Sequence, residues 1–159
     1  MSPVPGVSFP KVVAVAIAAL ILTAVPLPRA IAILRPDFVA LAVIAFGIFA
    51  PRSGGLLFAF LLGLALDAFK GVVLGQHALA LVTISFITLN LHLRIRMFTL
   101  GQQALTVLSL LWLKEFMIFW IDGATGHSIT DATRWIAVVT GGLIWLFVPQ
   151  FMTRLLTRR

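Results

Sequence analysis

Charged side chains stand singly between long apolar runs in this chain, and this spacing constrains its fold more than any other feature. Only 11% of the residues are charged, against roughly 25% in soluble domains. The apolar residues, 61% of the total, extend over the whole length and so are not confined to one core. The sequence therefore predicts an all-α integral membrane protein with a single domain over residues 1–159.

The 159 residues leave room for six crossings, since six helices of about 20 residues need about 120. The second predicted span is short for a crossing, and a re-entrant hairpin over 36–70 is its structural alternative. Residues 11–28 also resemble a signal peptide, but equally apolar segments follow, which favours a retained first span. The predicted spans are about 11–27, 36–50, 54–70, 76–91, 102–121 and 135–156.

The net charge of +7 does not indicate nucleic-acid binding. The Lys and Arg residues are scattered between apolar runs, as expected of topology signals and contacts with lipid headgroups. With six spans, more of them lie on the side of the N-terminus than on the other side. This distribution predicts that both termini are cytoplasmic. The absence of cysteine excludes disulfides and thiol catalysis.

The segment from Gly55 to Gly75 carries small or polar residues four positions apart. In a helix this spacing forms an inclined ridge along which backbones can approach closely. Lys70 followed by a glycine predicts a helix end. The ridge consists of Gly55, Ala59, Gly63, Asp67, Gly71 and Gly75.

Asp67 lies about one turn before that predicted helix end, where the macrodipole disfavours an anion, so it needs a partner. The functional interpretation is a buried partner contact, or a group coupled to protons or ions. The structural interpretation is an ion pair with Lys70 or capping of the following loop. Lys114 and Glu115 point about 100° apart and should pair poorly with each other. Lys114 either pairs with Asp67 across helices or extends to the interface.

Other local patterns predict structure rather than chemistry. Pro36 fits the first turn of the second helix, and Asp37 complements its N-terminal dipole. The basic stretch 92–98 suggests a segment at the membrane surface, with Arg94 and Arg96 toward headgroups or a protein. In the last span, Gly141-Gly142 permits close packing and Pro149 should bend the helix.

No catalytic or metal-binding pattern is visible. The histidines lie in separate segments without a second ligand at metal spacing. The sequence contains no HExxH, no GxSxG and no phosphate-binding glycine loop. We therefore predict neither an enzyme, a metal site nor a cofactor.

Several local patterns together, in order along the chain, resemble the family of the rod shape-determining protein MreD. The Lys114-Glu115 pair departs from the acidic residue that this family would place alone in that helix. The patterns are Arg35-Pro36-Asp37, Gly63-Leu64, Asp67 with Gly71, Leu74 to Ala80 (LGQHALA), Gln102 to Leu105 (QQAL) and Phe119-Trp120.

The resemblance implies a small multi-pass protein of the bacterial inner (cytoplasmic) membrane, in the machinery that builds the lateral peptidoglycan wall. Its partners would be MreC, the filament protein MreB, and RodA with its class B transpeptidase partner. The family has no known catalytic residues. Its six-helix architecture is similar to the substrate-binding subunit of energy-coupling-factor transporters.

We therefore predict a non-catalytic scaffold that docks the membrane helix of MreC and associated wall synthases. The alternative is a small-solute (vitamin-like) binding subunit of a membrane transporter. Helix packing and partner contact are assigned to Gly63, Asp67, Gly71, Gly75, Lys114 and Glu115. Loop structuring is assigned to Arg35, Pro36, Asp37 and Gln76, and contact with MreB or anionic lipid to Arg94 and Arg96.

Overall fold

A computed structural model describes residues 9–26, 28, 33–126 and 133–157, and these residues are helical apart from short connections. Each of the six predicted apolar segments contains a helix, and the last one is divided into two. The helices are α1 (Phe9–Ala24), α3 (Phe38–Phe49), α4 (Leu56–Lys70), α5 (Gln76–Met97), α6 (Leu100–Thr125), α7 (Thr133–Ile144) and α8 (Val148–Thr157).

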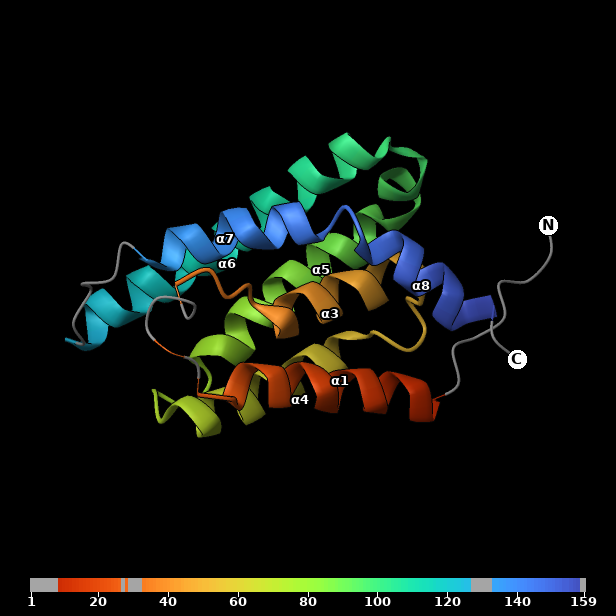
Figure 1. The fold of residues 1–159 in the computed structure, drawn as a ribbon. Coiled ribbons are helices and arrows are strands. Elements are labelled where there is room, and N and C mark those ends of the chain that lie inside the picture. Colours follow the sequence, from red (N-terminus) through yellow and green to blue (C-terminus); the bar gives the residue numbers. More distant parts are fainter. Residues whose placement is uncertain (1–8, 27, 29–32, 127–132, 158–159) are drawn as a thin grey trace.

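Helix α3 lies in the middle of the bundle. In Figure 1, α1 and α4 run along one side of it, and α6 and α7 lie on the other. Every residue from Val39 to Ile48 is buried, because α3 contacts α1, α4, α5 and α8. A helix covered by protein on all sides is expected to be apolar all round, and this explains the uninterrupted apolar sequence of α3.

Among the described helices, α5 and α6 are long and apolar enough to cross a membrane. A third crossing is available if α7 and α8 form one span, with a bend of 51° between them. The break at 145–147 is followed by Pro149 in the first turn of α8, which agrees with the predicted bend. Gly141 and Gly142 pack against Leu111 and Leu108 of α6, so the predicted close packing is confirmed.

Helices α4 and α5 approach each other closely at Gly63. A Cβ atom at this position would lie 2.2 Å from the Cα of Ala78. The predicted close contact at Gly63 is therefore real, but it joins two helices of the same chain. Gly63 is therefore buried in the contact between α4 and α5, and it is not available to pack against the helix of another protein.

Gly71 and Gly75 do not belong to the predicted packing ridge. Helix α4 ends at Lys70, as predicted, and Gly71 follows with φ of 63°. Gly75 precedes α5 with φ of 100°. A Cβ on either glycine would meet nothing within 4 Å. Both residues are thus required for left-handed turn conformations and not for helix contact.

The basic stretch 92–98 is not a separate surface segment, because α5 continues through it to Met97. Arg96 donates a hydrogen bond to the carbonyl oxygen of Phe49 at 2.9 Å, and its guanidinium lies 5.9 Å from the centre of the Phe49 ring. It thereby ties the end of α5 to the end of α3. Arg94 is exposed and remains available to lipid or a partner.

Candidate functional site

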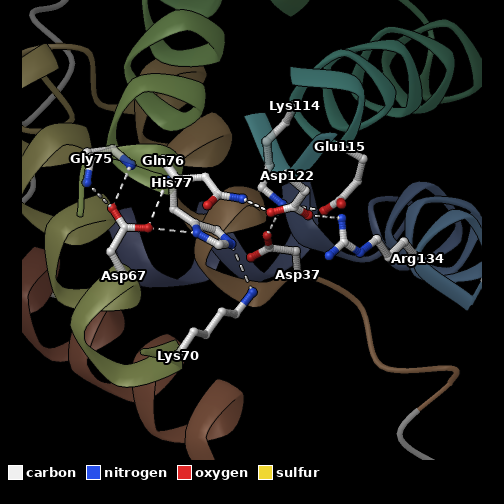
Figure 2. Close-up of polar contacts among 11 residues, drawn as sticks. Asp37, Asp67, Lys70, Gly75, Gln76, His77, Lys114, Glu115, Asp122 and Arg134 are labelled. Atoms are coloured by element: carbon white, nitrogen blue, oxygen red, sulfur yellow. Dashed lines mark hydrogen bonds and ion pairs between the residues drawn. The ribbon is translucent and has the colours of Figure 1, made fainter. Parts of the chain in front are cut away.

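Four of the chain's five acidic side chains gather at one end of the bundle, where α3 and α5 begin and α4 ends. Figure 2 shows them with three cations, a histidine and a glutamine. We call this group the polar layer. Its members are Asp37, Asp67, Lys70, Gln76, His77, Lys114, Glu115, Asp122 and Arg134.

Asp67 is completely buried and holds the turn between α4 and α5. Its carboxylate accepts hydrogen bonds from the backbone N–H groups of Gly75 at 2.8 Å and His77 at 2.9 Å. Two free N–H groups at the start of a helix are thus satisfied by an anion, which the helix dipole favours. The structural interpretation of Asp67 as the cap of the following loop is confirmed.

His77 adds a side-chain contact to this cap (Figure 2). Its Nδ1 lies 2.8 Å from Asp67 Oδ1, and its Nε2 lies 3.1 Å from Lys70 Nζ. An ammonium group can only donate, so Nε2 accepts and the ring proton on Nδ1 is donated to Asp67. Asp67 and Lys70 therefore do not form the predicted ion pair, and the ring of His77 bridges the two side chains instead.

Lys114 binds two carboxylates and is 1% exposed. Its Nζ lies 2.5 Å from Asp37 Oδ2 and 2.5 Å from Glu115 Oε1. The predicted pairing of Lys114 with Asp67 is wrong, because Asp67 is turned toward the start of α5. The expectation that Lys114 and Glu115 pair poorly is also wrong, since the flexible lysine stem can swing its ammonium group back to its neighbour.

Asp37 joins this cluster to α3. Its Oδ1 accepts a hydrogen bond from the backbone N–H of Ala40 at 2.9 Å, so it is the N-cap of α3. The predicted match between Asp37 and the start of this helix is confirmed. Pro36 precedes the cap and does not lie in the first turn as predicted. Arg35 donates to the carbonyl oxygen of Val25 at 2.8 Å and so ties the 33–37 connection to the end of α1.

Gln76 extends the layer to α6 and α7. Its side-chain amide donates to Asp122 Oδ1 at 2.6 Å, and Arg134 donates to Asp122 Oδ2 at 2.5 Å. The sequence interpretation assigned Gln76 to loop structuring but missed Asp122, Arg134 and His77. The available signal was their position, because each follows or precedes an apolar run at the same predicted end of the bundle.

The polar layer is built to join helix ends. Its carboxylates face cations or backbone N–H groups, as buried charges must. Among the described residues, no group of three His, Cys, Asp or Glu side chains could hold a metal ion. The ion pairs and hydrogen bonds of the polar layer therefore hold the helix ends rigidly together.

The apolar hollows on the sides of the described bundle include two grooves beside α1. The first, with a volume of about 240 Å³, lies between α1 and α8 with α3 as its floor. The second, of about 530 Å³, lies between α1 and α4 and ends at Arg52 and Ser53. We call them the α1–α8 groove and the α1–α4 groove.

Comparison with known proteins gives one family and one relative. The family described as rod shape-determining protein MreD matches residues 7–155. The protein named rod shape-determining protein MreD of Haemophilus influenzae is 26% identical over 137 residues, which cover 86% of this chain and 85% of that protein. No solved structure matches the chain.

Proposed function

The chain belongs to the rod shape-determining protein MreD family, and on that premise we propose that it is a non-catalytic membrane scaffold of the cell-elongation machinery. Membership of this family supports a role in determining rod shape. The scaffold would hold the membrane helix of MreC, and through it RodA, its transpeptidase partner and MreB. It would lie in the bacterial inner membrane with both termini in the cytoplasm.

The α1–α8 groove is the observation that carries this proposal. All of its lining residues are apolar, so it offers no charge that would select a polar solute. Four of them are alanines, and small residues let a second helix backbone approach closely in lipid. The alanines are Ala18, Ala19, Ala42 and Ala45.

The groove also has a rigid floor. Ala42 and Ala45 belong to α3, whose residues are buried among the other helices. Leu22 and Phe151 form part of the rims and are exposed by 49% and 57%, so they can fold over an inserted helix. Packing of this kind supplies the association energy that the hydrophobic effect does not provide between helices in lipid.

The solute-binding alternative has weaker support. A hydrophilic solute needs several polar groups that converge on a cavity. In the described part of the chain, the buried polar groups of the polar layer contact one another instead. The grooves beside α1 are lined mainly by apolar residues.

Filling the α1–α8 groove tests the docking proposal. Ala18 lines this groove and is exposed, so Ala18→Leu should place a larger side chain where the partner helix packs. Ala68 of α4 is also exposed and lines neither groove, so Ala68→Leu is the matched control. Both variants should insert normally, since alanine and leucine are both compatible with a membrane helix.

We expect Ala18→Leu to reduce co-purification of MreC severalfold and to round cells that carry it as their sole copy. Ala68→Leu should retain both MreC and the rod shape. Equal retention of MreC by the two variants would contradict docking in this groove. Rod shape that persists after deletion of the gene would instead contradict the shape-determining role itself.

A further inference from the structure

We propose that the α1–α4 groove binds one glycerophospholipid, with an acyl chain between the two helices and the phosphate at Arg52. Helices α1 and α4 contact each other only sparsely, so an elongated apolar hollow remains between them. It is separate from the α1–α8 groove, and the proposal does not depend on docking of MreC.

The length of the groove and an adjoining hollow matches that of an acyl chain. The groove is lined by Ile17 and Leu20 from α1 and by Leu57 and Leu61 from α4. The same two α1 residues line an adjoining hollow that extends to Phe69. The distance along α4 from Leu57 to Phe69 is about 18 Å, and one leaflet of the hydrocarbon core is about 15 Å thick. One lipid tail therefore fits along the groove.

A cation lies near each end of the groove, but only one of the two lines it. At one end, Arg52 is exposed and lines the groove, and no described residue forms a hydrogen bond or ion pair with its guanidinium. Lys70 lines a neighbouring hollow that shares Leu20 with the groove, and its ammonium group already contacts His77. Arginine binds phosphate through several donors held in a fixed plane. Charge complementarity thus places the phosphate at the Arg52 end.

The backbone at this end adds to the positive potential. Helix α4 begins beside Arg52, and its N-cap residue, Gly55, provides no side-chain hydrogen bond. The positive end of the helix dipole thus faces the same region. A protein helix as the occupant would leave the guanidinium without an anion, whereas a phospholipid supplies one together with the apolar chain.

Lipid retention by the purified protein tests this proposal. Wild-type protein, Arg52→Gln and Arg154→Gln are extracted from the same membranes in a mild detergent, and bound phospholipid is counted by native mass spectrometry. Arg154 is an exposed arginine in the last turn of α8 and lines neither groove, so it controls for the loss of one positive charge.

We expect the wild type and Arg154→Gln to retain one phospholipid. Arg52→Gln should retain about tenfold less, the effect of one charge-assisted hydrogen bond. A wild-type protein without bound phospholipid would overturn the proposal. Equal retention by the two arginine variants would overturn it as well.

A second variant pair tests the apolar half of the site. Leu61 in the groove and Leu79 on α5 are similarly exposed, by 57% and 55%. Leu61→Trp should fill the groove and release the lipid, whereas Leu79→Trp should not. A photoreactive amino acid at Leu57 should form lipid adducts in native membranes. Adducts with protein alone would show that a helix occupies the groove and would refute lipid binding.

Discussion

At the scale of single residues, Lys114 carries the most demanding charge of the polar layer. A buried ammonium group is tolerated only when anions compensate for its lost hydration. Lys114 has two of them, Asp37 from the start of α3 and Glu115 from its own helix. Both carboxylates are themselves mostly buried, with side-chain exposures of 16% and 15%. The three charges therefore stabilise the fold only as a set.

Removing the central cation should expose this dependence. We expect Lys114→Met to lower the free energy of unfolding by about 3 kcal/mol, because two carboxylates then lie buried without a counter-ion. The triple variant Asp37→Asn, Lys114→Met, Glu115→Gln should recover most of this loss. Asparagine keeps an oxygen for the Ala40 N–H bond, so the cap of α3 survives. Unfolding of the purified protein in detergent measures both effects.

Additive losses in the free energy of unfolding from the three substitutions would contradict this view. If the triple variant were less stable than Lys114→Met alone, the carboxylates would be stabilised by groups other than Lys114. If Lys114→Met matched the wild type, the ammonium group would not compensate buried charge at all.

The residue types indicate which side chains need a polar partner, but they do not indicate which residues provide it. Asp67 was expected to require a partner because of its place near a helix end, and it has one. The partners lie across the turn after α4: Gly75 is the second of its two left-handed glycines, and His77 follows it. Lys114 finds Asp37 in a segment far away along the chain. Such pairings depend on how helices pack, which spacing within one segment cannot specify.

At the scale of helices, the contact between α4 and α5 depends on the absence of a side chain at one position. The sequence predicted that small residues in α4 mark a close approach, and Gly63 confirms it. It did not predict that the neighbour is the next helix in the chain. A ridge of small residues looks the same whether the partner helix is internal or belongs to another protein.

Replacing Gly63 by alanine should force these two helices apart. The new Cβ would lie 2.2 Å from Ala78 Cα and 2.5 Å from its backbone nitrogen, and backbone atoms cannot rotate away. We expect a loss of about 1–3 kcal/mol, seen as a lower midpoint of thermal unfolding. Gly101→Ala is the control, because its Cβ would meet nothing within 4 Å. Equal midpoints for the two variants would refute the close contact.

The limits of α5 show how side-chain charge can mislead an assignment. Two arginines near residue 95 suggested that the apolar span ends at 91, yet the helix continues to Met97. Arg96 is accommodated because it donates a hydrogen bond to the carbonyl oxygen of Phe49 at the end of α3. Cations are favoured at helix C-termini, so the arginines belong to the last turns of α5.

At the scale of the whole molecule, the short helix α3 determines how the chain can sit in a membrane. Its 12 residues extend about 18 Å, well short of the roughly 30 Å hydrocarbon core. A lipid-exposed helix of this length would be poorly matched to the bilayer. Since α3 is enclosed by its neighbours, protein rather than lipid surrounds it, and a short helix can connect the two faces.

With α3 enclosed in this way, we predict six crossings, of which α3 is a complete one, and the cysteine-free chain allows a direct test. Single cysteines replace Leu34, Arg52, Leu74 or Met97, which are all exposed and lie at helix ends, and a membrane-impermeant thiol reagent is applied to intact cells. Positions 34 and 74 should react from outside, and positions 52 and 97 only after permeabilisation. In a re-entrant hairpin over 36–70, position 52 would be shielded within the bilayer while position 97 still reacted after permeabilisation. Protection of position 52 under both conditions would therefore show that α3 and α4 turn back within the membrane.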